Sequence, residues 1–331
     1  MKTNLKKLLY SGVTLMSLVV LAACSSTSSS TTTSSSAATS QTSVATISNN
    51  STSSDSSSST IDWSALPTTE VTLSNDGLKI TEGGTYILTG STTAGVTVET
   101  DANVRIILAG AEISSSDTAA INVINADNVE LEIKDGTTNT VKDTSNHTDT
   151  NIEGAIHVEA DLTITGNGSL TVEGNFHDGI VSTDDLIVNS GNITVTAVDD
   201  GIRGKDSLTI NGGTINVIAG GDGIKSTNDT DTTKGYTTIT GGEITVKAGD
   251  DGIKAETALT IDGGTITVSE SAEALEGTNI TINGGTIDVT AQSAFDFDGT
   301  AELTGGTVTV NGEQITQITA TGPGAGGHGG W

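Results

Sequence analysis

The second half of the chain repeats itself every 21 or 22 residues, and this repeat limits the possible folds more than any other feature. Four apolar positions recur in phase, and one longer step of 29 residues holds an inserted segment, residues 228–234. A unit this short cannot bury an apolar face alone, whereas stacked copies can. The repeat therefore predicts a solenoid with one unit per coil. The four columns are Val188, Ile210, Ile239, Ile261, Ile282 and Leu303; Ile193, Ile215, Ile244, Ile266, Ile287 and Val308; Val195, Val217, Val246, Val268, Val289 and Val310; and Ile180, Ile202, Ile224, Ile253, Leu275 and Phe297.

Apolar and polar residues alternate within each unit, as in residues 214–217, where Ile215 and Val217 share one side. A period of two indicates strands. Three short strands per coil, each pairing in parallel with the next coil, predict an all-β parallel β-helix with about 21–22 residues per coil. The repeated Gly-Gly pairs are expected at sharp bends. Residues 61–160 follow the rhythm less regularly and are expected to form the first of some ten or eleven coils.

Residues 1–23 have the pattern of a lipoprotein signal peptide. Lys2, Lys6 and Lys7 precede an apolar run at 8–20, and the cleavage site Leu21-Ala22-Ala23 ends at Cys24, the only cysteine of the chain. The run is short for a transmembrane helix. The sequence thus predicts lipidation of Cys24 and a lipid-anchored position on the extracellular face of a bacterial cell membrane.

Residues 24–60 are expected to be the lipidated cysteine and a disordered stalk, because Ser and Thr dominate and large apolar side chains are nearly absent. A parallel β-helix is expected over residues 61–321. A glycine-rich tail at 322–331 completes the predicted domain organisation.

The charge balance restricts the partners. The chain has 13 Lys and Arg against 41 Asp and Glu, a net charge of −28. Binding to nucleic acid or to anionic lipid through charge is therefore not expected, and the membrane is a partner only through the lipid anchor.

Several segments resemble a known family. They are 199–206 (Asp-Asp-Gly-Ile-Arg-Gly-Lys-Asp), 221–228 (Gly-Asp-Gly-Ile-Lys-Ser-Thr-Asn), 250–253 (Asp-Asp-Gly-Ile) and 294–299 (Ala-Phe-Asp-Phe-Asp-Gly). These are similar to the hallmark segments of the carbohydrate-binding domain-containing proteins, over about residues 68–322. The resemblance implies a calcium-binding, right-handed parallel β-helix of the pectate-lyase type. It also implies cellulose or acidic plant polysaccharides as ligands.

An acidic column runs in phase with the Ile180 column. It consists of Asp178, Asp200, Asp222, Asp251 and Glu273, with Asp199 and Asp250 beside it. Carboxylates about 4.8 Å apart repel one another, and Ca²⁺ bound by oxygen ligands would relieve the repulsion. The candidate metal ligands are Asp199, Asp200, Asp222, Asp250 and Asp251, with Asn228 and Asp229 from the insertion. The alternative is that nearby basic side chains neutralise the column.

Those basic side chains form a column of their own. Arg203, Lys225 and Lys254 each follow an aspartate of the acidic column by three residues. They are candidate carbohydrate-binding residues, since they could receive uronate carboxylates or sugar hydroxyls. If this were their only role, replacing Lys225 and Lys254 with alanine would weaken binding and leave the melting temperature nearly unchanged.

The function expected from the sequence is non-catalytic, calcium-dependent binding of cellulose, polygalacturonate or a cell-wall glycan at the cell surface. A rigid structural protein or adhesin is an alternative, because a fold does not fix a function. A polysaccharide lyase is a weaker one: β-elimination needs a base, and Arg203 belongs to a repeated column rather than a singular site. No catalytic residue is assigned.

Overall fold

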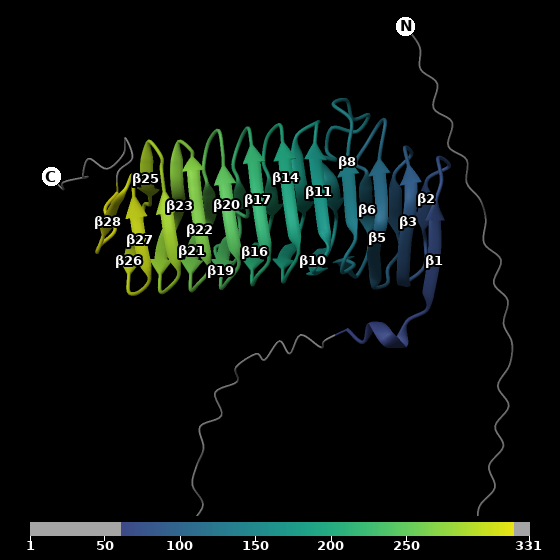
Figure 1. Ribbon diagram of the computed structural model, residues 1–331, viewed down its shortest axis with the longest axis horizontal. Coiled ribbons are helices and arrows are strands. Elements are labelled where there is room, and N and C mark those ends of the chain that lie inside the picture. The colour runs from purple at the N-terminus through teal and green to yellow at the C-terminus, as the bar shows by residue number, and fades with distance from the viewer. Residues whose placement is uncertain (1–60, 321–331) are drawn as a thin grey trace, which may run out of the picture. The chain divides into compact units, whose positions relative to one another are not determined.

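The computed structural model describes residues 61–320, which all fall in one compact unit. Their coils follow one another along a single axis, from β1 at one end to β28 at the other (Figure 1). The predicted signal peptide, Cys24, the stalk and the glycine-rich tail lie outside the described residues. A short 3-10 helix, η1 (Trp63–Ala65), precedes the first strand. No helix within residues 61–320 has the length and apolar character that crossing a membrane requires.

The strands form three columns in which each strand pairs in parallel with those of adjacent coils. The first column contains β1 (Thr68–Leu73), β3 (Gly84–Thr92), β5 (Val104–Ser114), β7 (Asn128–Ile133), β10 (Asp161–Gly166), β13 (Asp185–Val188), β16 (Ser207–Ile210), β19 (Tyr236–Ile239), β21 (Ile253–Ile261), β23 (Glu273–Ile282) and β26 (Ala301–Leu303). The second contains the ends of β3 and β5, then β8 (Thr138–Lys142), β11 (Ser169–Gly174), β14 (Asn192–Ala197), β17 (Thr214–Ala219), β20 (Glu243–Lys247), β22 (Thr265–Glu270), β24 (Thr286–Val289) and β27 (Thr307–Val310). The third contains β2 (Leu78–Ile80), β4 (Val96–Glu99), β6 (Ile121–Asn125), β9 (Gly154–Val158), β12 (Asp178–Ser182), β15 (Ile202–Gly204), β18 (Ile224–Ser226), the starts of β21 and β23, and β25 (Ser293–Asp296).

The parallel β-helix predicted from the repeat is confirmed. The expected ten or eleven coils agree with the longest column of described strands, which has eleven members. One described pairing departs from the parallel pattern: β28 (Glu313–Ile315) turns back and pairs antiparallel with β27. This hairpin covers part of the edge that the last coil would otherwise leave unpaired.

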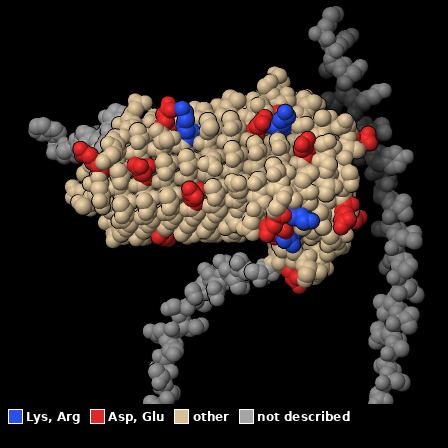
Figure 2. All heavy atoms as spheres, in the orientation of Figure 1, with Lys and Arg blue, Asp and Glu red and all other residues tan. Residues whose placement is uncertain are grey.

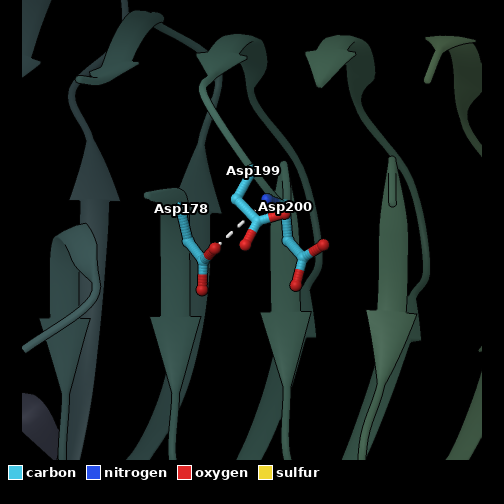
Figure 3. Close-up of side chains that lie close together, drawn as sticks. All are labelled: Asp178, Asp199 and Asp200. Atoms are coloured by element: carbon cyan, nitrogen blue, oxygen red, sulfur yellow. Dashed lines mark hydrogen bonds between the residues drawn. The ribbon is translucent and has the colours of Figure 1, made fainter. Parts of the chain in front are cut away.

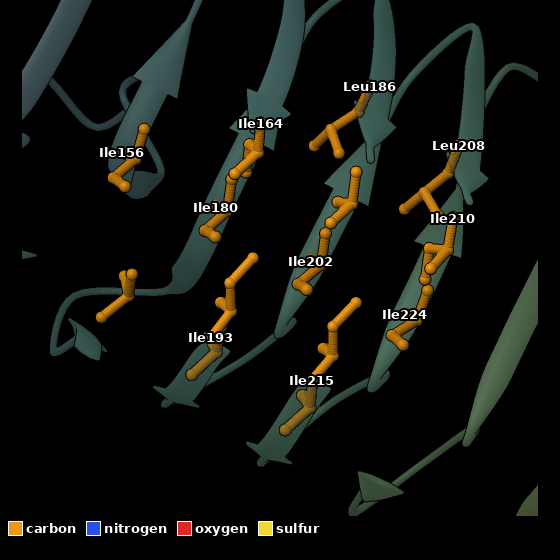
Figure 4. Packing of buried hydrophobic residues seen from close by; sticks show 14 of the residues in the cluster. Ile156, Ile164, Ile180, Leu186, Ile193, Ile202, Leu208, Ile210, Ile215 and Ile224 are labelled. Atoms are coloured by element: carbon orange, nitrogen blue, oxygen red, sulfur yellow. The ribbon is translucent and has the colours of Figure 1, made fainter. Parts of the chain in front are cut away.

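The core is a set of apolar ladders along the axis (Figure 4). Ile193, Ile215 and Ile244 are paired in register in β14, β17 and β20, and each is 0% exposed. The predicted alternation is confirmed, since Thr214 and Asn192 in the same strands face outward. Because each side chain packs against its equivalent above and below, neighbouring coils complete one another's core.

The prediction was wrong for one residue of the apolar columns, Phe297. Leu275 pairs with Phe295 rather than with Phe297, and Phe295 is 2% exposed. Phe297 is only partly buried against the core. The reason is that this coil is shorter than the one before it, so the residue that pairs with Leu275 follows after 20 residues, whereas Leu275 follows its partner Ile253 after 22.

The Gly-Gly pairs lie at bends, as expected. The second glycine of each pair has a left-handed backbone, with φ of 95° at Gly213 and 97° at Gly242. Glycine adopts this conformation without the clash that a Cβ atom would cause.

A second glycine column explains the repeated Asp-Gly-Ile segments. A Cβ atom at Gly223 would lie 2.3 Å from Cγ1 of Val246 and 2.6 Å from the carbonyl oxygen of Gly252. A Cβ atom at Gly201 would come equally close to Val217 and to the backbone of Gly223. These glycines therefore allow close contact between the third and second columns.

We expect Gly223→Ala to lower the free energy of unfolding by about 1–3 kcal/mol, because backbone and core side chains must move to admit the methyl group. Gly277→Ala is the matched control, since its Cβ atom would meet nothing closer than 3.3 Å. Urea unfolding followed by circular dichroism measures both. Equal stability of the two variants would contradict the close packing described for Gly223.

Candidate functional site

Buried aspartates line the start of the third strand column. Asp178, Asp200, Asp222 and Asp251 are 2–5% exposed, and each is followed by a Gly-Ile pair at the start of a strand of this column, at or just inside its first residue. The Asp200 N–H donates to Asp178 Oδ1 at 3.1 Å, as Figure 3 shows. The N–H groups of Asp222 and Asp251 donate in the same way to the preceding aspartate, each at 2.9 Å. The aspartates thus form a hydrogen-bonded ladder from coil to coil.

The three predicted basic residues neutralise this ladder. Lys225 Nζ lies 2.6 Å from Asp200 Oδ2 and 3.0 Å from Asp222 Oδ2, so one ammonium group joins two coils. Lys254 Nζ lies 2.9 Å from Asp251 Oδ2. Arg203 Nη2 lies 2.9 Å from Asp178 Oδ2 and also bonds Glu153. The ion pairing that the sequence left as an alternative to a metal is therefore present.

Burial shifts the ionisation of these groups. It raises the pKa of Asp178 to about 6, although the Arg203 charge acts in the opposite direction. Burial would lower the pKa of Lys225, but the hydrogen bond and charge of Asp200, followed by those of Asp222, raise it above its ordinary value. Lys225 consequently stays protonated at neutral pH.

Two exposed aspartates extend the ladder into carboxylate triads. Asp178, Asp199 and Asp200 form the first triad, and Asp222, Asp250 and Asp251 form the second. In each triad, one ligand atom per residue lies within 4.8 Å of the others. Asp199 and Asp250 are exposed, so each triad has one open side. Such groups of oxygen ligands suit a hard divalent cation.

The second triad carries an excess of carboxyl groups. Asp251 Oδ1 is buried without a hydrogen-bond donor, and the Glu273 and Glu276 carboxyls lie beside Asp251. Burial, followed by the hydrogen bond to Asp251, raises the pKa of Glu276, although Lys254 at 2.9 Å acts in the opposite direction. A cation here would satisfy Asp251 Oδ1 and neutralise the adjoining carboxyls. The donor set therefore fits a divalent cation better at the second triad than at the first.

The insertion contributes to neither triad. Asn228 lies beyond the far end of β18 from Asp222, and its Nδ2 donates to Asp206 Oδ1 at 2.6 Å. Its Oδ1 accepts from the N–H groups of Thr230 and Asp231, which shapes the inserted loop. Asp229 is exposed on the same loop. The structure thus places Asn228 and Asp229 apart from the other five predicted ligands.

Charged side chains are sparse on the face of the molecule drawn in Figure 2. Figure 2 shows a mostly uncharged face on which acidic side chains are scattered and the basic ones lie beside acidic ones. Positive charge is therefore locally neutralised on this face, as it is along the third column.

The family model described as "Carbohydrate-binding domain-containing protein" matches residues 74–316, which is most of the chain. The chain belongs to this family. The family resemblance inferred from the sequence is therefore confirmed, and it extends across nearly all of the described coils.

Two proteins are similar to this chain. A carbohydrate-binding domain-containing protein of Acetivibrio thermocellus is 33% identical over 135 residues, which is 38% of this chain and 47% of that protein. The chain thus matches about half the length of this relative. A solved structure titled as the polysaccharide lyase-like protein from C. thermocellum, gadolinium derivative, has a TM-score of 0.59 and 29% identity. It covers 72% of this chain and 98% of its own.

Some site residues were missed by sequence reasoning. Glu153 and Glu276 pair with the two ends of the basic column, and His157 occupies the position of that column two coils before Arg203. Glu276 does follow Lys254 by one repeat and was detectable from that spacing. His157 and Glu153 lie in the irregular coils, where the repeat gives no register.

Proposed function

We propose that the domain binds a polysaccharide chain without cutting it, and that calcium held by the acidic triads supports this binding. Membership in the carbohydrate-binding domain family is the observation that carries the proposal. Cellulose and polygalacturonate are the ligand classes to test first, together with cell-wall glycan. The parallel β-helix offers an extended surface on which a linear polymer can follow the coils.

The ionisation of the basic column supports a non-catalytic role. A lyase base must accept a proton near neutral pH. Arg203 is instead held by Asp178 and Glu153, which raise its pKa above the ordinary value against the effect of burial. The pKa values of Lys225 and Lys254 are raised as well.

The case for calcium rests on the second triad. Three carboxylates converge there, one buried oxygen has no donor, and two more carboxyls adjoin it. Bound calcium would also give an acidic polysaccharide a positive site on a chain of net charge −28.

The proposed location follows from the sequence alone. A lipid on Cys24 would anchor the protein to the extracellular face of the bacterial cell membrane. Residues 25–60 would then separate the β-helix from the bilayer. Labelling with a fatty-acid analogue, compared with Cys24→Ala, tests this anchor.

The function is tested by a pull-down of the purified protein with insoluble cellulose, peptidoglycan and immobilised polygalacturonate. The proposal expects binding to at least one of them and no increase in the ultraviolet absorbance that an unsaturated lyase product would give. Absence of binding to all three would favour a structural spacer. A rising absorbance would identify a lyase.

We expect removal of calcium with EDTA to lower the melting temperature and to weaken polygalacturonate binding together. At a hundredfold excess over Kd, a cation that binds only the folded state stabilises it by about 2.7 kcal/mol. Asp250→Asn should reproduce both losses, because Asp250 belongs to the triad but is exposed and outside the ion-paired ladder. Asp288→Asn, an exposed change on β24, is the control. An unchanged melting temperature and unchanged binding in EDTA would exclude the calcium site.

A further inference from the structure

The outer face of the second strand column carries a polar row, one side chain per coil, along the β-helix. Parallel pairing aligns its members from the end of β3 to β27, and neighbouring members lie about 4.8 Å apart. All but Glu112 and Asp288 are Ser, Thr or Asn. A row that repeats at each coil can contact a linear polymer at regular intervals. The polar row consists of Ser91, Glu112, Thr140, Thr171, Thr194, Asn216, Thr245, Thr267, Asp288 and Thr309.

The side chains of the polar row make no hydrogen bond or ion pair with any residue in 61–320. Polar side chains at the bend before the second column behave differently. Asn211 Nδ2 donates to Asn189 Oδ1 at 2.9 Å, and Thr240 Oγ1 donates to Asn211 Oδ1 at 2.9 Å. The bend thus satisfies its own polar groups from coil to coil, whereas the hydroxyls of the polar row can turn to a ligand.

Two exposed apolar side chains adjoin the polar row. Ile218 lies in β17 and is 52% exposed, and Val198 directly follows β14 and is 61% exposed. Ile218 points outward beside Asn216 and pairs with Thr196 of β14. Adjacent apolar side chains that face water instead of the core mark contact surfaces. Because a sugar ring has an apolar C–H face as well as hydroxyl groups, it can contact both these side chains and the polar row.

This face has little unpaired charge, although the chain has a net charge of −28. Lys247 Nζ lies 2.5 Å from Glu270 Oε2, and Lys142 is paired in register with Glu173. Figure 1 shows β11, β14, β17, β20 and β22 side by side, and Figure 2, in the same orientation, shows few charged side chains over them. An acidic polymer finds no cation without an acidic neighbour on these five strands. A neutral polymer therefore fits this face better.

A hollow lies at the start of the polar row. It has a volume of about 370 Å³ and is lined by the ends of β3 and β5 and by β8. Ser91, Glu112 and Thr140, the first three members of the polar row, all line it. One linear ligand can therefore extend from the hollow along the outer face of the following strands.

We propose that the outer face of the second strand column holds a neutral polysaccharide chain that lies along the axis of the β-helix. Sugar hydroxyls contact the polar row, and the apolar face of a sugar ring rests on Val198 and Ile218. The inference deepens the proposed function and rests on it. It places the neutral glycan on a different part of each coil from the acidic triads. Single exposed hydrogen bonds contribute little in water, so the affinity comes from contacts repeated over many coils.

The test is adsorption of the purified protein to microcrystalline cellulose, measured as depletion from solution. Ile218→Glu should weaken adsorption about tenfold, because the contact loses an apolar side chain and must remove water from a charge. The new carboxyl lies opposite Lys247 in β20, so the fold should tolerate it. Ile187→Glu is the matched control, since Ile187 points outward from β13 in the first column.

A second pair of variants tests the hydroxyl groups. Thr245→Ala combined with Thr267→Ala should weaken adsorption about fivefold, as expected for the loss of two hydrogen bonds to the ligand. Thr238→Ala combined with Thr260→Ala is the control. It removes two outward hydroxyls from the same two coils, but in the first column.

The outcomes separate this inference from the proposed function. If the wild type binds cellulose and both second-column variants adsorb as well as their controls, this face is not the contact surface, while the proposed function stands. Binding of polygalacturonate or peptidoglycan without binding of cellulose would overturn the neutral ligand and leave the proposed function intact. If the wild type binds no glycan, both fail. Should Ile218→Glu melt well below the wild type, the alanine variant of Thr245 and Thr267 at an unchanged melting temperature decides the case.

Discussion

Ile215→Asp is expected to unfold the coils around β17. Ile215 is 0% exposed and lies between Ile193 and Ile244 in an unbroken ladder. The change removes an apolar side chain and places a carboxyl where nothing can hydrogen-bond to it. Together these two effects should lower the free energy of unfolding by more than about 4 kcal/mol. Ile266→Asp should act in the same way one coil beyond Ile244. Thermal unfolding by circular dichroism and limited proteolysis measure the loss.

Thr214→Asp is the matched control, because it adds the same carboxyl one residue away on the outer face. Thr214→Asp should lower the free energy of unfolding by less than about 1 kcal/mol, although Glu243 lies opposite this position in β20. A similar loss of stability in both variants would contradict the assignment of inward and outward residues.

Lys225→Met is expected to lower the free energy of unfolding by about 3–5 kcal/mol, because it leaves the buried Asp200 and Asp222 without their shared cation. Methionine keeps most of the apolar stem, so the effect reports on the charge. The measurement is urea unfolding at neutral pH. The expectation that alanine at Lys225 and Lys254 would leave the melting temperature nearly unchanged no longer holds, since both side chains are largely buried and paired.

Lys247→Met is the control for this prediction. Its ion pair with Glu270 has a similar length, 2.5 Å, but both side chains are more than half exposed. Pairs of this kind contribute less than about 1 kcal/mol. If the two variants lost equal stability, burial would not be the reason that the Lys225 pairs matter.

The architecture of one coil was predictable from the amino-acid sequence. Equal spacing of Ile and Val residues requires that like side chains stack, because only stacking buries a short alternating strand. The ladders through Ile210, Ile215 and Val217, and the bend at Gly213, were predictable for this reason. The acidic and basic columns were predictable as columns, since they share the same period.

The ion-pair partners of those columns depend on how the coils stack in three dimensions. Whether Lys225 faces solvent or joins Asp200 to Asp222 depends on how far one coil is displaced from the next, and spacing within one coil does not contain that information. The shortened coil moved Phe295 into the core for a similar reason. Val198 and Ile218 come from different coils, so only the stacking of those coils brings them to one face.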